Sequence, residues 1–307
     1  MDFVINLNKP KGITSQEATT NVKKILRAKK AGHTGTLDPA ATGVLLICTN
    51  RATRFASYFS ELNKQYSAVM KLGETTDTQD AEGTVIEKKD TIEVDEITLK
   101  KTLQFFLGKV LQTPPMFSAL KFRGKPLYKY AHKGLDIPRK PREVIIHSLE
   151  LQDMNFPFVR FTVICSKGTY IRTLCHDIGR QLGTGAHLFE LERTSIDVFS
   201  IQESLSIEEL RTLREGLSET GQSPQNFKGV YTLDSALSWM PELKVPYSRI
   251  KAVKNGNPIR ELDGNGFPEV LKTAPGIKIK SPEGELLAVG SFISCNNEIK
   301  MDVVLAP

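Results

Sequence analysis

Apolar residues along this chain recur with two spacings, one typical of strands and one typical of helices. Alternating or continuous apolar runs predict strands over 44–48, 66–72 and 158–165. A shorter run, 84–87, is expected to pair with 66–72 as a hairpin across a polar loop. The first 240 residues thus contain several candidate strands that are widely separated along the chain.

Helical spacing of apolar residues follows Ser15, follows Asp95 and begins again at Ile171. Ser15 and Asp95 are expected to cap the first two helices, because their side-chain oxygens can accept hydrogen bonds from first-turn amides. The third helix should stop at Gly183, since glycine favours the backbone conformation that ends helices. The polar face of the first helix carries Lys23, Lys24, Arg27, Lys29 and Lys30. This basic face is either simply solvated or a contact for an RNA backbone.

The pattern changes towards the C-terminus. Residues 216–229 are rich in Gly, Ser, Gln and Asn, which indicates an exposed linker. Beyond about residue 243 the chain consists of short strands and turns, including 277–280 and 286–290 around a turn at 282–284. We therefore predict two domains, 1–240 and a small β-rich domain over 243–307.

Composition restricts the partners and the setting of the protein. The 307 residues carry 41 Lys and Arg against 35 Asp and Glu, a net charge of +6 that suits a protein which binds phosphate backbones. The four cysteines lie far apart, with no spacing typical of a zinc site or a redox pair. No run approaches the roughly 20 apolar residues that span a bilayer, and no secretion signal is apparent. We expect a reduced, cytoplasmic protein without a membrane partner.

A loop over 32–43 presents one carboxylate among glycines and a proline. Pro39 disfavours a helical conformation for Asp38 and holds that residue extended. The glycines at 32, 35 and 43 permit backbone turns that a side chain would forbid. On its own the loop fits either an ordinary solvated turn or a stiff loop that presents Asp38 for chemistry.

Residues 113–142 mix basic and aromatic side chains in a segment that contains Gly and Pro. Lys125, Lys129 and Lys133 are interspersed with Phe122, Tyr128 and Tyr130. Such a mixture is typical of surfaces that grip RNA, with cations on phosphates and rings on bases. The alternative is an irregular loop whose aromatic residues only anchor it to the core.

The Asp38 loop, together with Lys167–Thr173, resembles the TruB family of tRNA pseudouridine synthases. Five further blocks occur in family order, namely 8–15, 64–66, 72–78, 114–121 and 185–193. The resemblance implies an α/β (α+β) fold with a mixed, largely antiparallel sheet and flanking helices. Residues 113–142 match the family's thumb insertion, and 254–260 resemble the opening of a PUA-like RNA-binding domain in bacterial members. Phe117 departs from the family pattern, in which tyrosine is more common.

The resemblance also implies the chemistry, which is the isomerisation of the T-loop uridine at tRNA position 55. Asp38 matches the catalytic aspartate, and Arg172 matches the partner that keeps it ionised. Tyr170 matches the tyrosine that lies near the uracil and can move the C5 proton. Breaking the C1′–N1 bond and forming a C1′–C5 bond involves no redox change and no external group, so neither a cofactor nor a metal is required. Whether Asp38 attacks the base, attacks the sugar or removes a sugar proton stays open.

Three other residues match positions that hold the substrate in the family. Tyr66 corresponds to the ring that stacks on the target base, and Leu191 to a residue that lines the uracil pocket. His33 corresponds to the histidine that enters the RNA loop, and no second ligand at suitable spacing supports a metal role for it. The expected partner is the T-arm of tRNA, and the protein is expected to act as a monomer.

Three alternatives compete with this interpretation. The first is an RNA-binding or RNA-chaperone protein without activity, which the retained Asp38, Tyr66, Tyr170 and Arg172 argue against. The second is a guide-RNA-dependent pseudouridine synthase with a related core, which the basic segment 113–142 argues against. The third is a glycosidase-like hydrolase, which would need a second carboxylate, and the sequence offers no obvious candidate.

Overall fold

A computed structural model describes residues 2–89, 93–220, 227–260 and 266–305, with only the backbone of 217–220 described. Its largest feature is a ten-stranded sheet in the order β14-β1-β3-β12-β4-β11-β10-β7, with β13 paired to β12 and β2 to β3. All of these pairs are antiparallel except β3 with β12. The strands are β1 (Phe3–Lys9), β2 (Ala31–His33), β3 (Thr42–Thr49), β4 (Lys64–Leu72), β7 (Gly108–Gln112), β10 (Arg142–Asn155), β11 (Phe158–Cys165), β12 (Ala186–Ile196), β13 (Phe199–Ser200) and β14 (Val230–Thr232). The expected mixed, largely antiparallel sheet is confirmed.

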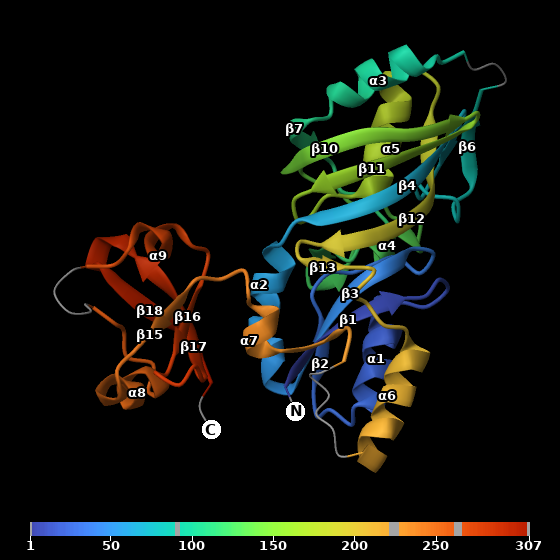
Figure 1. Ribbon diagram of the computed structural model, residues 1–307. Coiled ribbons are helices and arrows are strands. Elements are labelled where there is room, and N and C mark those ends of the chain that lie inside the picture. The colour runs from blue at the N-terminus through green and yellow to red at the C-terminus, as the bar shows by residue number, and fades with distance from the viewer. Residues whose placement is uncertain (1, 90–92, 221–226, 261–265, 306–307) are drawn as a thin grey trace.

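Helices cover this sheet in groups (Figure 1). Near one end, α1 (Ser15–Ile25) and α6 (Ile207–Thr220) lie side by side and bury the apolar residues of β1 and β3. Near the other end, α3 (Glu96–Gln104) and α5 (Ile171–Gln181) pack on β4, β10 and β11. The short helices η1 (Asn50–Phe55), α2 (Ala56–Glu61) and α7 (Leu233–Ala236) cover a third cluster of apolar residues.

Two small hairpins project from the sheet. One joins β5 (Glu74–Thr76) to β6 (Val85–Lys88), and the other joins β8 (Lys121–Phe122) to β9 (Lys125–Pro126), followed by α4 (Tyr128–Ala131). The expected hairpin between 66–72 and 84–87 is therefore wrong. Strand β4 already has β11 and β12 as its two neighbours, and the four residues of β6 are exposed.

The cap of the first helix also differs from the expectation. Thr14 is the N-cap residue: its hydroxyl accepts a hydrogen bond from the amide of Glu17, whose carboxylate accepts one from the amide of Thr14. The hydroxyl of Ser15 instead accepts from the amide of Leu37 at 2.8 Å and donates to the Leu37 carbonyl at 2.9 Å. Helix α1 is thus fixed to the residue that precedes Asp38.

A separate four-stranded sheet forms the C-terminal part of the chain, in the order β15-β16-β17-β18. Its elements are β15 (Glu242–Lys244), α8 (Tyr247–Lys254), α9 (Glu269–Thr273), β16 (Ile277–Lys280), β17 (Leu286–Ile293), η3 (Ser294–Asn296) and β18 (Glu298–Val304). The strands expected at 277–280 and 286–290 are confirmed. The linker expected at 216–229 is wrong at its start, because α6 runs to Thr220; residues 221–226 lie outside the described part of the chain.

The two sheets meet at α2 and α7 (Figure 1). Val289 and Val303 of the C-terminal sheet belong to the same apolar cluster as Phe59 and Ala236. Beside this cluster, the Nζ atom of Lys280 lies 2.8 Å from an Asp234 carboxylate oxygen and 2.9 Å from one of Glu242. Apolar and ionic contacts both connect the C-terminal sheet to the larger body.

Candidate active site

The Asp38 loop connects β2 to β3 and is fixed at several backbone atoms. Leu37 is held by Ser15, and the Asp38 carbonyl accepts a hydrogen bond from the Ala41 amide. The Pro39 carbonyl accepts one from the Gly12 amide at 2.8 Å. A loop held on both sides of Asp38 presents the carboxylate in one position, which matches the expectation of a stiff loop.

Lys9 lies beneath this loop and was not singled out by the sequence. Its Nζ atom donates to the carbonyls of Pro10, Ile13 and Pro39 at 2.9, 2.8 and 3.3 Å. The residue is fully buried, and this burial lowers the pKa of its ammonium to about 8 although the Asp38 charge raises it. Lys9 therefore joins the end of β1 to the backbone next to Asp38.

Arg193 supports the far end of the loop from β12. Its side chain is buried and donates to the carbonyls of Val44 and Gly35, at 2.6 Å from Nε and 3.1 Å from Nη2. Gly43 has a φ of +102°, and a Cβ at this position would lie 2.2 Å from the Arg193 carbonyl oxygen. Only glycine allows β3 and β12 to approach this closely, so the glycine at 43 serves packing as well as turning.

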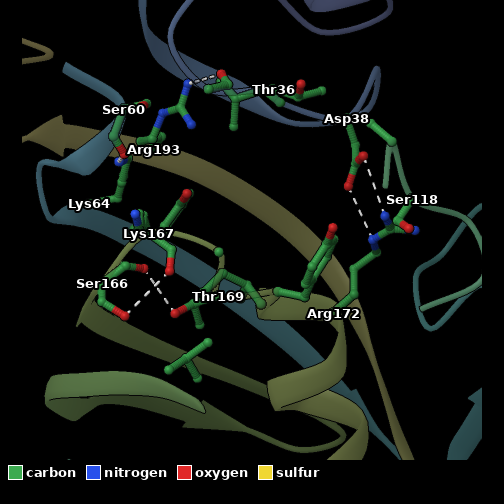
Figure 2. A pocket seen from close by; sticks show the side chains of 18 of the residues that line it. Thr36, Asp38, Ser60, Lys64, Ser118, Ser166, Lys167, Thr169, Arg172 and Arg193 are labelled. Carbon is green, nitrogen blue, oxygen red and sulfur yellow. Dashed lines mark hydrogen bonds and ion pairs between the residues drawn. The ribbon is translucent and has the colours of Figure 1, made fainter. Parts of the chain in front are cut away.

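Arg172, near the start of α5, holds Asp38 from the other side of the loop. Its Nε lies 3.1 Å from Oδ2 of Asp38, and its Nη2 lies 3.4 Å from Oδ1. Nη2 also donates to the Phe117 carbonyl at 2.7 Å, and Nη1 to the Thr78 carbonyl at 3.3 Å and to Asp80 Oδ2 at 3.1 Å. Five contacts on one guanidinium fix its plane, and Figure 2 shows the paired contacts to Asp38.

Two opposing influences act on the Asp38 carboxyl group. Its removal from water raises its pKa above the ordinary 3.8, and the Asp80 charge adds to this rise. The Arg172 and Lys9 charges act against it. The side chain nevertheless stays 41% exposed, so Asp38 is open to a ligand that enters the pocket.

Tyr170 directly precedes α5. Gln112 fixes its backbone, because the side-chain amide of Gln112 accepts from the Tyr170 amide at 3.0 Å and donates to the Tyr170 carbonyl at 3.3 Å. Burial raises the pKa of the Tyr170 hydroxyl, and the Ser118 hydroxyl and the Arg172 charge oppose this rise. Tyr170 is thus a neutral phenol near neutral pH, on a rigid backbone.

A cavity of about 590 Å³ brings together five of the six residues expected to act or to bind substrate in the core. Asp38, Tyr66, Tyr170, Arg172 and Leu191 all line it, and they come from the Asp38 loop, β4, α5 with its cap, and β12. Figure 2 shows Asp38 and Arg172 on one side of the pocket, opposite Lys64, Lys167 and Arg193. Burial raises the pKa of Tyr66, whose ring forms part of the apolar wall.

His33 is the core residue that does not line this cavity. It lies in β2 opposite Ile47, and its Nδ1 atom is buried without a hydrogen-bond partner in the described part of the chain. Burial, followed by the Arg193 charge, lowers the pKa of the imidazole. Nothing in the local geometry assigns it to the pocket.

The thumb segment, residues 113–142, forms part of the pocket wall and leaves its lysines in solvent. Lys125, Lys129 and Lys133 are exposed, and within the described residues their side chains form no hydrogen bond or ion pair. The rings contact one another rather than stand free: Phe122 packs on Tyr130 with ring centroids 6.0 Å apart. Phe117 packs edge-on against His132, and its backbone carbonyl, not its side chain, contacts Arg172.

Sequence reasoning missed several groups that the fold brings to the site. Asp80 is the second carboxylate beside Asp38, and Lys64 is a buried cation whose Nζ donates to the carbonyls of Ser60 and Leu62. Burial lowers the pKa of Lys64 to about 8. The blocks 64–66, 72–78 and 185–193 pointed to these regions, but the contacts with Arg172 and Asp38 join residues far apart in the chain.

The described residues contain no group of three or more His, Cys, Asp or Glu side chains placed to hold a metal ion. They also contain no helix long and apolar enough to cross a membrane.

Comparison with known proteins agrees with this geometry. A model of the TruB family pseudouridylate synthase N-terminal domain matches residues 23–171, and one of the tRNA pseudouridylate synthase B C-terminal domain matches 172–238. A tRNA pseudouridine synthase B of Photobacterium profundum is 42% identical over 85% of this chain and 83% of its own length. The chain belongs to the TruB family. The corresponding protein of Vibrio campbellii is 39% identical over 92% of this chain and 87% of its own.

Solved structures extend the similarity of this TruB-family enzyme to the C-terminal sheet. A chain from a Cbf5-Nop10-Gar1 complex matches with a TM-score of 0.75 and 28% identity, covering 99% of this chain and 84% of that one. A chain from an archaeal box H/ACA sRNP Nop10-Cbf5 complex matches with a TM-score of 0.74 and 26% identity, covering 99% and 86%. The two family models end at residue 238, whereas these matches run through β15 to β18.

Proposed function

We propose that this TruB-family pseudouridine synthase isomerises the uridine at position 55 in the T loop of tRNA, as a cytoplasmic monomer and without a cofactor. The single observation that carries the proposal is the Asp38 carboxylate, open to a cavity and held by Arg172 at 3.1 Å. The names of the relatives, tRNA pseudouridine synthase B, supply the class of RNA.

The reaction breaks the C1′–N1 bond, turns the uracil, forms a C1′–C5 bond and moves a proton from C5 to N1. Asp38 is the catalytic carboxylate, and the Arg172 contacts favour the ionised form that can act as a nucleophile or a base. Tyr170 lies in the same cavity wall, where its hydroxyl can accept and return the C5 proton. Arg172 positions Asp38 and places positive charge beside the reacting base.

Binding requires that the target nucleotide leave its stack. Tyr66 offers a ring on which the flipped uracil stacks, worth roughly 1–3 kcal/mol, and Leu191 closes the apolar side of the pocket. His33 lies outside the cavity lining, so we assign it to the RNA loop around the target rather than to the uracil. Each of these groups acts on a nucleotide that has been extruded from the tRNA.

Two further regions bind the rest of the tRNA in this proposal. The thumb lysines Lys125, Lys129 and Lys133 contact the phosphate backbone of the T-arm, because they are exposed and free of local ion pairs within the described residues. The domain over 243–307 is a PUA-like RNA-binding domain appended to a catalytic domain over 1–240. The separate C-terminal sheet and its match to Cbf5 chains support this division.

A guide-RNA-dependent synthase is the second candidate, because one of the matched Cbf5 chains comes from an archaeal box H/ACA sRNP complex. The hydrolase alternative weakens for a different reason. Asp80 is the carboxylate nearest in role to a second acid, yet Oδ2 accepts from Arg172, and Oδ1 accepts from the Thr78 hydroxyl at 2.5 Å and the Glu82 amide at 3.1 Å. Both oxygens of Asp80 thus accept hydrogen bonds from the protein itself, unlike those of a general acid that faces its substrate.

The deciding experiment incubates the purified protein with an unmodified tRNA transcript whose uridines carry tritium at C5, without guide RNA. We expect tritium release and chemical mapping of one pseudouridine, at position 55. The same preparation of the Asp38→Asn variant controls for contaminating host enzyme. Release that depends on added guide RNA would favour the second candidate, and base release without isomerisation would favour a hydrolase.

A further inference from the structure

Ser118 lies at the base of the thumb segment, next to the residue whose carbonyl holds Arg172. Its side chain is buried, with only 4% of the residue exposed, and it lines the cavity that contains Asp38 and Tyr170. Its backbone is fixed, because the amide donates to the Met116 carbonyl at 2.9 Å and the carbonyl accepts from Tyr128 at 3.1 Å. These two bonds hold the Cα atom of Ser118 in place at the cavity wall.

The Ser118 hydroxyl has no hydrogen-bond partner among the described residues. It lies near enough to the Tyr170 hydroxyl to influence it, but not in the geometry of a hydrogen bond. Figure 2 shows Ser118 on the same side of the pocket as Asp38 and Arg172. A buried hydroxyl without a partner destabilises a protein, and such groups are rare unless a ligand completes them.

A second hydroxyl in the same cavity is in the same state. Thr34 is 6% exposed, lines the cavity near Gly35 and also has no partner in the described part of the chain. Two unpartnered hydroxyls on one cavity indicate that its walls are built for a ligand with polar edges. Of the two, Ser118 lies on the side of the pocket that holds the proposed catalytic groups. Thr34 instead precedes Gly35, whose carbonyl accepts a hydrogen bond from Arg193.

We propose that the Ser118 hydroxyl forms a hydrogen bond with the target nucleotide. The proposal rests on the proposed function and adds a residue to the same pocket. A serine hydroxyl both donates and accepts, so it suits a uracil carbonyl, the N3–H group or the ribose 2′-hydroxyl. A site that hydrogen-bonds a polar group discriminates strongly against an analogue that lacks it, because the protein group is then left unpaired.

The test measures the melting temperature and kcat/KM of Ser118→Ala and of the wild type. Together these two quantities distinguish a hydroxyl that binds substrate from one that only stabilises the fold. As a ligand-binding group, the hydroxyl contributes nothing to the free protein, so the variant should melt at or above the wild-type temperature. The steady-state kcat/KM on the tRNA transcript should fall about tenfold, which is the usual effect of losing one hydrogen bond. Ser118→Thr, which keeps the hydroxyl, should recover most of the rate.

Ser204→Ala is the matched control, since Ser204 is a buried serine outside the cavity lining whose hydroxyl donates to the Ile201 carbonyl. It should lower the melting temperature and leave kcat/KM unchanged. Normal kcat/KM for Ser118→Ala, or a loss of rate that accompanies a loss of stability as large as in Ser204→Ala, would overturn the proposal. Because the wild type is measured in parallel, inactive wild type would instead refute the proposed function.

A second arm identifies the atom that Ser118 contacts. A T-arm RNA with 2′-deoxyuridine at the target position removes the ribose hydroxyl and nothing else. If Ser118 binds that hydroxyl, the deoxy substitution should weaken wild-type binding but cost Ser118→Ala nothing further in Kd. If Ser118 binds the uracil edge, the two losses should multiply.

Discussion

The pocket region and the thumb segment both carry cationic side chains, but these side chains differ in their burial and in their partners. Around the Asp38 loop, two cations are buried and each has several fixed partners: Lys9 contacts three carbonyls, and Arg172 contacts two carboxylates and two carbonyls. In the thumb, Lys125, Lys129 and Lys133 extend into solvent without partners among the described residues. The same charge is therefore structural in one region and available to a ligand in the other.

This difference indicates which side chains should contribute to turnover and which should contribute to RNA affinity. Fixed groups need little reorganisation when substrate arrives, so they favour chemistry over affinity. Free lysines gain from phosphate contact and counterion release, so they favour affinity with little effect on chemistry. Changes in the pocket should alter turnover, and changes in the thumb should alter binding.

Asp38→Asn should have the largest effect, with turnover reduced by more than about 10³-fold, because the other carboxylates near the site are paired, Asp80 with Arg172 and Glu143 with Lys109. Affinity for tRNA should stay within a few-fold, since the amide keeps the size of the side chain. Single-turnover tritium release and filter binding measure the two quantities. Asp153→Asn, on the exposed part of β10, is the matched control and should behave as wild type. Residual turnover above about one per cent would show that Asp38 is a turn residue without a catalytic role.

The pH dependence gives a second check on the same carboxylate. The folded-state pKa of Asp38 lies above its ordinary 3.8, so activity should be lost, as the pH falls, at a higher pH than an exposed aspartate would show. The sign for stability follows from the same shift. Ionised Asp38 disfavours folding above its raised pKa, so Asp38→Asn should gain stability relative to wild type as the pH rises from 3 to 7, and thermal melts at both pH values measure this change.

Tyr170→Phe should reduce turnover by about 10²-fold or more with unchanged tRNA affinity, because only the hydroxyl proposed to move the C5 proton is lost. Tyr130→Phe offers a control in the thumb, where the lost hydroxyl donates only to the Phe122 carbonyl. Near-normal product formation by Tyr170→Phe would exclude its role in proton transfer and leave it as a wall of the pocket.

Arg172→Lys should lower both stability and turnover, which sets it apart from Asp38→Asn and Tyr170→Phe. A lysine cannot reproduce the fork that contacts Asp38, Asp80, Thr78 and Phe117. We expect about 10-fold to 100-fold lower turnover, and about 2–4 kcal/mol lower stability because a buried ion pair loses its geometry. Arg180→Lys, on the exposed end of α5, is the control in urea unfolding and activity assays. An unchanged unfolding midpoint for Arg172→Lys would show that the guanidinium contacts are not energetically coupled to the fold.

The smallest expected effect belongs to the thumb. Replacing Lys125, Lys129 and Lys133 together by Ala should weaken tRNA binding several-fold and lower the slope of log Kd against log salt by at most about three units. Single-turnover chemistry at saturating RNA should change by less than about threefold, because no pocket contact is lost. A charge-matched control replaces Lys88, Lys100 and Lys109, whose ammonium groups are already paired with carboxylates. Equal salt slopes for both triple variants would place the RNA elsewhere.

Local patterns in the sequence predicted the elements that local physics determines. The strand at 158–165, the cap at Asp95 and the end of α5 before Gly183 are confirmed. The incorrect predictions concern which of two adjacent residues caps a helix and which strand pairs with which. Thr14 rather than Ser15 caps α1, because Ser15 is held by Leu37, and β6 pairs with β5, because β4 is already flanked on both sides. Such outcomes depend on contacts between distant residues, which periodicity does not record.

The site shows the same division. A resemblance carried by short blocks assigned Asp38, Tyr66, Tyr170, Arg172 and Leu191, and all five line one cavity. It could not show that Asp80 shares Arg172 with Asp38, that Lys9 lies buried below the loop, or that Ser118 has no partner. Each of these facts requires the chain to be folded, since the residues concerned come from different strands and loops.

The apolar cluster shared by α2, α7 and the C-terminal sheet has a consequence for how the chain comes apart. Val289 and Val303 fill space beside Phe59 and Ala236, so removal of the C-terminal sheet would expose apolar residues of α2 and α7 to water. Apolar contacts of this kind couple the stability of one region to that of the other. Recombination could therefore replace the C-terminal domain only with a domain whose side chains fit the same recess beside α2 and α7.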